Sequence, residues 1–517
     1  MEIQAQIPFE KLNVLSKITK DFISEGPNFS FGNNFSDEKI LAELEAMNFS
    51  THNRQVLVES LQEQYLSAGI EVPKSVELLK ESNTYTITTG HQLCLFTGPL
   101  YMVYKIASVI KMCEQLNASH AKQSFVPVFW MASEDHDFEE ASKVNVHNEA
   151  IVWKGKAEGA VGRMSVDNLR EAAKELKSLL GVNGEEFTSM INDSIDAKNV
   201  AGSYRKLINS IFGDQIVIID ADDKNLKRLF LDTAIKDLNG ESIEALSKTN
   251  QELAVKGYKP QVNGREINLF WLEEGSRERI IKSEGGYQIL GNDRIYSFKE
   301  ITDLFKSEPE SVSPNVILRP VYQQLILPNL VYVGGGGEIA YWLQLKDMFT
   351  KLDVHYPMLQ VRASFVVMQE KWLGKWNDLG FSVNDLFRSK DDLKKEFVVK
   401  NQGNPLEVSR QKFDSLMAEL KKESLEIDLN MKDGVSADIT KMTKGMDKLE
   451  KRVSKTMKNA NQLTNERIDR IIDMVYPNGN FQERYSSIFD VFANVQEINS
   501  VIQFADSTTN SLKIIKY

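Results

Sequence analysis

The feature that most constrains the fold of this chain is a repeated order of short apolar run, glycine turn and helical pattern. The run at 84–89 (TYTITT) ends at Gly90 and is followed by apolar residues at helical spacing, and the same order returns at 330–346 (LVYVGGGGEIAYWLQLK). A further apolar run at 125–131 lacks alternation, which is typical of a strand buried on both faces, and another strand is expected from Gln215 (QIVIIDADD), where the run ends in acidic residues. The repetition predicts an α/β fold whose parallel sheet binds ligands at the carboxyl ends of its strands.

Changes in composition predict three domains. Residues 1–376 contain all six tryptophans and the strand units, with a helical lead-in over 1–80 and a small antiparallel insertion near 250–300, where glycine turns join short apolar runs. An elaborated edge of the main sheet is the alternative to that insertion. Residues 377–475 are rich in Lys and Glu, and residues 476–517 regain aromatic side chains and are expected to dock on the core.

The second of these domains has the pattern of a coiled coil. Apolar residues alternate at steps of four and three, as the a and d positions of a heptad repeat do, at Val435, Ile439, Met442, Met446, Leu449 and Val453. The pattern continues to Val475, so we expect a helix roughly 60 Å long. Such a helix needs its apolar seam covered, which predicts an antiparallel partner helix and a homodimer. A helical hairpin within one chain is the alternative.

Charge and cysteine content restrict the classes of function. The 62 basic and 73 acidic residues leave a net charge of −11, which argues against nucleic acid as a partner. Cys94 and Cys113 are the only cysteines, which excludes a disulfide framework and favours a reducing compartment. The sequence shows no basic and apolar leader and no uncharged apolar window of 18 residues, so we expect a cytoplasmic protein with no membrane partner.

The first candidate motif is residues 88–105 (TTGHQLCLFTGPLYMVYK). A strand that ends in glycine and leads into a helix can present backbone N–H groups to an anion, although the Rossmann fingerprint and the P-loop are both absent. A purely structural turn is the alternative. The residues expected to bind a nucleotide or another anion are Thr89, Gly90, His91, Gln92 and Gly98.

The second motif is residues 133–144 (SEDHDFEEASKV), directly after an apolar run. Asp135, His136 and Asp137 place titratable groups at a strand end, where a cationic amine or a metal would relieve their mutual repulsion. We predict that these three residues are catalytic. The alternative is an acidic helix start, with capping residues and a favourable helix dipole.

The third motif contains four consecutive glycines at 334–337. Their conformational-entropy cost is hard to justify unless the backbone approaches another group closely. The helix that follows is expected to present the Glu338 carboxylate, an aromatic ring and the Lys346 ammonium group on one face. Arg319 and Arg362 lie near strand ends, where an arginine can bind a carboxylate or a phosphate. The residues expected to bind substrate are Arg319, Gln323, Gly335, Gly336, Glu338, Tyr341, Trp342 and Arg362.

Taken together, TGHQLCLFTGPLY, PVFWMASEDHDFEE, LRPVYQQLILPNLVYVGGGGEIAYW, VRASF and PNGNFQER resemble the cysteine ligase family of bacillithiol biosynthesis over almost the whole chain. The resemblance implies a Rossmann-like core similar to class I aminoacyl-tRNA synthetases, a connecting-peptide insertion and a C-terminal coiled-coil domain that forms a homodimer. It also implies the addition of L-cysteine to the amine of glucosaminyl malate, the last step to bacillithiol. The chain departs from the family pattern at His91, usually Gln, and at Gly335 and Gly336, where a Pro is common.

An amide bond requires an activated carboxylate, so we expect ATP as co-substrate, with magnesium only as its companion and no metal site in the protein. We hypothesise that phosphates lie against the turn at 90–98, that Arg319 or Arg362 holds a carboxylate, and that His136 takes a proton from the sugar amine. Cys94 is expected to be a small buried residue.

Three rival functions follow from the same motifs. One is a nucleotide-dependent ligase or nucleotidyltransferase of synthetase-like fold with a different acceptor. The second is a metal-dependent hydrolase that uses Asp135, His136 and Asp137. The third is a coiled-coil scaffold with a vestigial pocket.

Overall fold

The computed structural model describes residues 1–26, 29–156, 158–402, 406–428, 430 and 432–517, and these form two compact units. Unit 1 comprises Met1–Val367 and Gln482–Ile515, and unit 2 comprises Met368–Phe481 and Lys516–Tyr517. Among the residues described, no helix is both long enough and apolar enough to cross a membrane.

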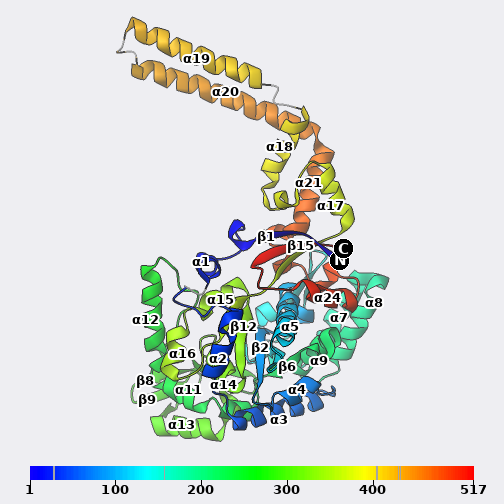
Figure 1. Ribbon diagram of the computed structural model, residues 1–517, viewed down its shortest axis with the longest axis vertical. Coiled ribbons are helices and arrows are strands. Elements are labelled where there is room, and N and C mark those ends of the chain that lie inside the picture. The colour runs from blue at the N-terminus through cyan, green and yellow to red at the C-terminus, as the bar shows by residue number, and fades with distance from the viewer. Residues whose placement is uncertain (27–28, 157, 403–405, 429, 431) are drawn as a thin grey trace. The chain divides into compact units, whose positions relative to one another are not determined.

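The core of unit 1 is a sheet of five strands in the order β13-β12-β2-β3-β6, and every pairing in it is parallel. The strands are β2 (Thr84–His91), β3 (Ser124–Met131), β6 (Val217–Asp220), β12 (Asn329–Gly334) and β13 (Met358–Val361). The predicted parallel α/β core is therefore confirmed. Strands β3 and β6 extend the sheet on one side of β2, whereas β12 and β13 extend it on the other, so the strand order reverses between β2 and β12. Figure 1 shows β12 and β6 on either side of β2. Ligands of open α/β sheets bind at such a switch point.

Helices connect and cover these strands. In unit 1 they are α1 (Lys17–Glu25), α2 (Ile40–Ala46), α3 (Thr51–Ser67), α4 (Lys74–Leu78), α5 (Tyr101–Ser119), α6 (Phe138–Ala141), α7 (Leu169–Leu180), α8 (Glu185–Ile195), α9 (Val200–Phe212), α10 (Lys224–Arg228), α11 (Leu231–Leu238), α12 (Glu241–Val255), α13 (Phe298–Ser307), α14 (Arg319–Ile326), α15 (Gly336–Trp342), α16 (Lys346–Leu352), α22 (Gln482–Tyr485), α23 (Ile488–Val491) and α24 (Val495–Ser500).

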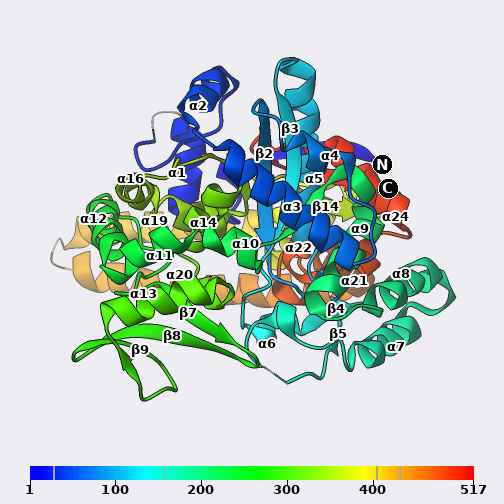
Figure 2. The ribbon, with the colours of Figure 1, turned by 90° about the horizontal axis from the view of Figure 1, so that it is seen from below.

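Both faces of the parallel sheet are buried. Successive side chains of a strand point to opposite faces, and on β3 the Phe129 ring stacks on Tyr204 of α9 while the Trp130 ring meets Tyr322 of α14 edge-on. Figure 2 shows α3 passing in front of the sheet. Burial on two faces explains why the sequence of this strand shows no alternation.

A second sheet of unit 1 is antiparallel, in the order β10-β9-β8-β7-β11. Its strands are β7 (Leu269–Glu273), β8 (Ser276–Ser283), β9 (Gly286–Ile289), β10 (Ile295–Tyr296) and β11 (Val312–Pro314). Two-residue turns join β7 to β8 and β8 to β9, and each contains a glycine at positive φ, +75° at Gly275 and +92° at Gly285. Tight hairpin turns need this left-handed conformation, which glycine adopts without a steric cost.

The chain termini meet in a three-stranded sheet in which β15 (Ser511–Lys516) lies between β1 (Glu2–Pro8) and β14 (Ser364–Met368). The expected helical lead-in therefore begins with a strand, because the alternation of Ile3, Ala5 and Ile7 favours a half-buried strand over a helix. A separate two-stranded sheet pairs β4 (Lys143–Val146) with β5 (Glu149–Val152).

Unit 2 is helical, as the coiled-coil prediction requires. Its helices are α17 (Glu370–Asp378), α18 (Lys390–Gln402), α19 (Glu407–Ile427), α20 (Lys432–Ala460) and α21 (Gln462–Val475). Helices α19 and α20 form a hairpin in which Arg410 of α19 pairs with Asp447 at 2.7 Å and Glu450 at 3.0 Å. The single helix expected to reach Val475 is interrupted at Asn461, whose φ of −104° and ψ of 33° are not helical.

Candidate functional site

The carboxyl ends of the parallel strands bring the three motifs to one edge of unit 1. Strand β2 ends at His91, β3 ends just before the acidic loop, β12 ends at Gly334, and β13 leads into Arg362. The Arg362 N–H donates to the Gly334 carbonyl at 2.9 Å, which ties the last two strand ends together. Parallel strands share the direction of their ends, so residues far apart in sequence become neighbours here.

An ion pair between a buried lysine and a partly buried glutamate joins the two glycine turns at the switch point. Lys105 of α5, 4% exposed, donates to the Gly90 carbonyl at 2.9 Å and pairs with the Glu338 carboxylate at 2.5 Å. Glu338 also accepts hydrogen bonds from the Gly335 N–H at 2.9 Å and the Tyr332 hydroxyl at 2.7 Å. Burial alone would raise the pKa of Glu338, but Lys105 and these donors outweigh it and lower that pKa. Lys105 was not singled out from the sequence, although a lysine inside the apolar run YMVYKIASVI was the available signal.

Arg319 has only neutral hydrogen-bond partners among the residues described. Its guanidinium donates to Gln323 Oε1 at 3.0 Å and to the Tyr341 hydroxyl at 3.2 Å, and it lies 5.6 Å from the Trp130 ring and 5.8 Å from the Tyr332 ring. Gln323 is fully buried, and in the described part of the chain its Nε2 finds no hydrogen-bond partner. An unpaired charge and an unused amide donor side by side are suited to an anionic or carbonyl group of a ligand.

Arg362, the other arginine predicted to bind substrate, already pairs with a carboxylate of the protein. Its guanidinium donates to both oxygens of Glu483, at 2.9 and 2.6 Å, and the Ser364 hydroxyl donates to Glu483 at 2.6 Å. Glu483 lies in the late motif PNGNFQER, whose spacing along the chain carries no hint of this pairing. The charge of Arg362 is thus neutralised within unit 1.

The helix after the glycine run ends earlier than the pattern suggests. Helix α15 stops at Trp342, so Lys346 begins a new helix and does not share a face with Glu338 and Tyr341. The Trp342 ring is fully buried and stacks on Tyr332 at 4.3 Å between ring centres, inside an aromatic cluster. Of the predicted aromatic pair, only Tyr341 contacts Arg319.

His91 is held on both ring nitrogens. Nδ1 lies 2.8 Å from the Gln92 carbonyl, which can only accept, so Nδ1 carries the proton, and Nε2 then accepts from the Tyr101 hydroxyl at 2.9 Å. Burial, followed by the nearby charge of Lys105, lowers the pKa of His91 to about 4. His91 is therefore neutral at physiological pH and supports the turn.

The turn after β2 already uses several of its own N–H groups. Gly98, at φ +66°, packs so closely on Cys94 that an added Cβ would lie 2.6 Å from the Cys94 Cβ. Its N–H donates to the Leu95 carbonyl, and the Leu100 N–H donates to the Ser486 carbonyl, both at 2.9 Å. These donors at the start of α5 are not available to a phosphate.

Close packing within the chain also explains other predicted glycines. A Cβ on Gly90 would come within 3.3 Å of Trp130, and a Cβ on Gly336 would lie 2.4 Å from the Leu15 side chain. Thr89 is fully buried, and its hydroxyl has no partner among the described residues. Gly335 is the exception, because its nearest such contacts are the charged side chains at the switch point.

The acidic motif lines a cavity of about 620 Å³, whose walls are Gln92, Asp135, His136, Asp137, Phe138, Glu139 and Ser142. Gln92 donates to Asp135 at 2.7 Å, which connects the first motif to the second. Asp137 accepts from the Glu140 N–H at 3.0 Å and caps α6, so the predicted helix start is present beside this cavity. Burial, and next the charge of Asp137, raise the pKa of Glu140.

A buried network supports this acidic loop. Lys227, fully buried, pairs with Glu134 at 2.7 Å and Asp222 at 2.8 Å, and Arg163 holds both oxygens of Asp222. Asp220 accepts from the Ser133 hydroxyl, and burial, together with the charge of Asp222, raises the pKa of Asp220 to about 6. The ends of β3 and β6 are thereby locked together.

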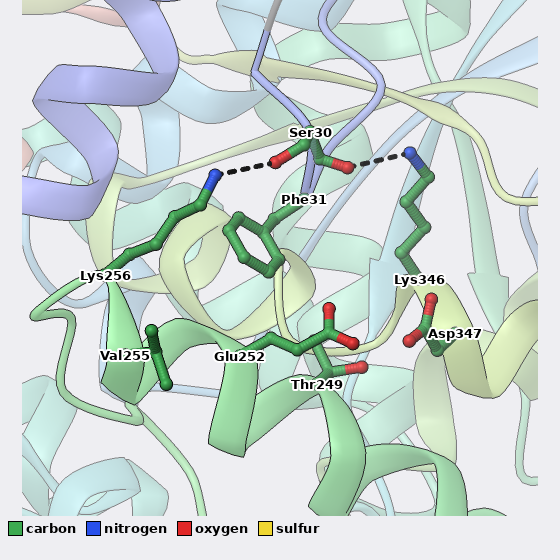
Figure 3. A pocket seen from close by; sticks show the side chains of 8 residues that line it. All are labelled: Ser30, Phe31, Thr249, Glu252, Val255, Lys256, Lys346 and Asp347. Carbon is green, nitrogen blue, oxygen red and sulfur yellow. Dashed lines mark hydrogen bonds between the residues drawn. The ribbon is translucent and has the colours of Figure 1, made fainter.

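Unit 1 contains a second cavity of about 390 Å³, lined by Ser30, Phe31, Thr249, Glu252, Val255, Lys256, Lys346 and Asp347. Figure 3 shows Lys256 and Lys346 on either side of Ser30, where Lys256 donates to the hydroxyl at 3.3 Å and Lys346 to the carbonyl at 3.0 Å. Of its lining residues, only Lys346 belongs to one of the three motifs. In the part of the chain that the structure describes, no group of three or more His, Cys, Asp or Glu could hold a metal ion.

Two sequence models of one family together match nearly the whole chain. "Bacillithiol biosynthesis BshC, N-terminal Rossmann-like domain" matches residues 1–363, and "Bacillithiol biosynthesis BshC, C-terminal coiled-coil domain" matches residues 365–517.

Curated relatives carry the name "Putative cysteine ligase BshC". The protein from Flavobacterium johnsoniae is 38% identical over 503 residues and covers 94% of each chain. The protein from Flavobacterium psychrophilum is 36% identical over 539 residues, 99% of each chain, and that from Bacillus cytotoxicus is 26% identical over 455 residues, 83% of this chain and 84% of its own.

Among solved structures, the tryptophanyl-tRNA synthetase of Plasmodium falciparum matches 88% of this chain and 100% of its own at 12% identity, with a TM-score of 0.24. That score is too low to carry an argument about fold or function.

Proposed function

The chain belongs to the bacillithiol biosynthesis BshC family, and from this premise we propose that it is an enzyme that ligates L-cysteine to glucosaminyl malate. The amide bond forms between the cysteine carboxylate and the glucosamine amine, as the last step to bacillithiol. The names of the relatives support the ligase and the cysteine; the acceptor is the part of the proposal that an assay has to establish.

The observation that carries this proposal is the separation of opposite charges along one edge of the sheet. On one side, Arg319 has no carboxylate partner among the described residues and lies beside the unused amide of Gln323. On the other side, Asp135 and Asp137 line an open cavity. A ligase that joins a carboxylate to an amine needs a cationic site for the first and an anionic site for the second.

ATP is the co-substrate that we propose for activation of the carboxylate. A carboxylate oxygen is a poor leaving group, whereas the acyl phosphate or acyl adenylate formed from ATP releases phosphate or AMP when an amine attacks. We assign the anionic reactant group to Arg319 and Gln323, because the Gly98 and Leu100 N–H groups of the turn at 90–98 already donate within the chain. Magnesium accompanies the nucleotide.

The amine reacts only after it loses a proton. As an ammonium group it is attracted to the Asp135 and Asp137 carboxylates, and a carboxylate then accepts its proton. Glu140, whose pKa burial and Asp137 raise, lies beside them and is a further acceptor.

Reconstitution tests this function directly. Purified protein is incubated with cysteine and glucosaminyl malate, with and without ATP, and the products are identified by mass spectrometry. We expect the cysteinyl amide only with ATP, together with AMP or ADP. No product with this acceptor but turnover with another amine would establish a different ligase. Stoichiometric zinc or manganese in the purified protein, together with hydrolysis and no amide formation, would favour the hydrolase.

Matched arginine variants test the anionic site. Arg319→Met removes a charge-assisted contact worth about 1.5–3 kcal/mol, so kcat/KM should fall roughly 10- to 100-fold. The control is Arg294→Met, because Arg294 is on the surface with a 60% exposed side chain. Equal activity of the two variants contradicts the assignment of Arg319.

We also propose a homodimer formed through the α19–α20 hairpin, in a reducing cytoplasm that keeps the buried Cys94 and Cys113 free. Four apolar side chains of the hairpin are 40–50% exposed, namely Leu416, Leu420, Met442 and Leu449. On each helix these side chains lie beside the line of residues that contacts the other helix, and on the same side of that line. In an antiparallel pair of helices, all four therefore face the same side of the hairpin. A second copy would cover this apolar face.

A further inference from the structure

Arg277 of β8 is held rigidly by the antiparallel sheet. Its Nε and one terminal nitrogen donate to the Ser313 hydroxyl at 3.2 and 3.1 Å, and that same terminal nitrogen donates to the Pro314 carbonyl at 2.9 Å. The guanidinium also lies 4.1 Å from the centre of the Phe270 ring. These contacts come from β11 and β7, so the neighbouring strands aim the remaining guanidinium nitrogen in one direction.

That remaining nitrogen donates to His136, at 2.9 Å from Nδ1. A guanidinium is always protonated and cannot accept a hydrogen bond, so Nδ1 supplies the lone pair. In a neutral imidazole the proton must then be on Nε2. Asp135 is 3.8 Å from the same Nδ1, which is too long for a competing hydrogen bond.

The surroundings of His136 favour this state. Its side chain is 54% exposed and belongs to the wall of the acidic cavity, so Nε2 can reach a bound molecule. The charged groups around it are Asp135 and Asp137 on its own loop and Arg277 from β8, and Glu134 and Asp222 lie near that arginine. A proton on Nδ1 would place two donors face to face and break the contact with Arg277.

We propose that Arg277 is a positioning residue that fixes His136 as an Nε2–H hydrogen-bond donor toward the reacting carbonyl. This rests on the proposed function, because it requires the activated cysteine and the amine to meet in the acidic cavity. It also replaces the hypothesis that His136 takes the amine proton, since the only lone pair of the neutral ring is already engaged.

The donor acts at the step that forms the amide. The amine nitrogen attacks the acyl carbon, the carbonyl π electrons move to oxygen, and the Nε2–H of His136 stabilises that oxyanion. The oxyanion then collapses, the bond from the acyl carbon to the phosphate or adenylate oxygen breaks, and phosphate or AMP leaves. The amine proton passes to the Asp135 or Asp137 carboxylate.

Nitrogen NMR of the full-length protein with ¹⁵N-histidine tests the coupling without any turnover. We expect the His136 signals of an Nε2–H tautomer, assigned by their loss in His136→Gln. Arg277→Met should remove this preference and Arg277→Lys should restore part of it, whereas Arg279→Met, the same change two residues along β8, should leave it intact. A wild-type Nδ1–H tautomer, or a tautomer insensitive to Arg277→Met, overturns the proposal.

Turnover of substituted enzymes tests the role of the donor. An amide nitrogen of Gln can replace Nε2–H. His136→Ala should lower kcat about 10²- to 10³-fold, as loss of an oxyanion donor does, while His136→Gln should stay at least ten times faster than His136→Ala and keep the acid limb of the wild-type pH profile. Equal loss in both variants, or an acid limb that vanishes in His136→Gln, identifies a base and overturns the donor role.

The two proposals fail in distinguishable ways. If wild-type protein makes no amide from cysteine, ATP and glucosaminyl malate, the proposed function fails, and the NMR result still decides whether Arg277 sets the tautomer of His136. If wild-type protein is active and the histidine variants behave as a base predicts, only the inference about the donor fails.

Discussion

Lys105 connects two glycine turns that are far apart in the sequence of unit 1. Its ammonium group bridges the Gly90 carbonyl and the Glu338 carboxylate, and both side chains are largely removed from water. Bringing two charges out of water is expensive, and their attraction roughly offsets that cost. The pair therefore matters most when one member is lost, because the other charge then remains without compensation.

Lys105→Met should lower the free energy of unfolding by about 3–5 kcal/mol, since Glu338 would lose its cation. Urea unfolding measures this loss, and the double variant with Glu338→Gln should recover part of it. The control is Lys111→Met on the same helix, because Lys111 pairs with a half-exposed Glu114 and such pairs contribute little. A similar small effect at both lysines contradicts this account of the buried pair.

Asp237 is a fully buried carboxyl group at the end of α11. It accepts from the Asn268 N–H at 2.6 Å and from the Asn268 amide at 3.1 Å, just before β7 begins. Burial raises its pKa from 3.8 to about 6 despite these donors. The folded state thus holds a proton that the unfolded chain releases between those two pH values.

Because the folded state binds this proton more tightly than the unfolded chain, protonated Asp237 contributes to the free energy of unfolding. That contribution is fully present below pH 3.8 and is lost as the pH rises to about 6. The loss amounts to about 3 kcal/mol. Urea unfolding over this pH range should show a shallower decline for Asp237→Asn than for wild type. Asp232→Asn, at an exposed position of the same helix, should keep the wild-type slope, and an unchanged slope in Asp237→Asn would refute the assignment.

At the scale of elements, the α19–α20 hairpin leaves an apolar flank uncovered. We expect light scattering after size exclusion to give twice the 58.7 kDa chain mass for wild type. Leu416→Lys with Leu449→Lys should give the mass of a single chain, because two charges would enter the apolar contact. Ser415→Lys lies on the opposite face of α19 and should leave the dimer intact; a monomeric wild type rules the dimer out.

Local patterns predict elements well where the pattern is uniform and less well where it is short or broken. The non-alternating run at 125–131 became β3, because burial on both faces leaves a clear mark. Residues 2–8 alternate as a strand does, but the segment is short and helical spacing follows it, so a helical lead-in was predicted there. The long heptad pattern hid the break at Asn461, because apolar spacing reports which face is covered and not where the backbone leaves the helix.

At the scale of the whole molecule, the last strand closes unit 1. Strand β15 lies between β1 and β14, and its Leu512, Ile514 and Ile515 are fully buried. A strand with partners on both sides cannot be removed without exposing both. Residues close to the end of the chain therefore contribute to the same folding unit as residues at its start.

Ile514→Ala should lower the free energy of unfolding by about 2–5 kcal/mol, because the cavity it leaves is enclosed on all sides. Urea unfolding followed by tryptophan fluorescence measures this. Val182→Ala removes an aliphatic side chain that is 90% exposed and should change stability by no more than about 0.5 kcal/mol. If Ile514→Ala were as mild as Val182→Ala, β15 would not be an integral strand.

The sequence by itself determined the parallel core and the gathering of three motifs at one edge. Apolar runs and glycine turns are local signals, and parallel strands necessarily end on the same side. Only the tertiary structure decided which side chains meet: Lys105 pairs with Glu338, Arg362 pairs with Glu483, and Arg277 donates a hydrogen bond to His136. Periodicity describes the face of an element, whereas these partners are brought together by the paths of distant strands and helices, so their spacing in the sequence carries no record of the contact.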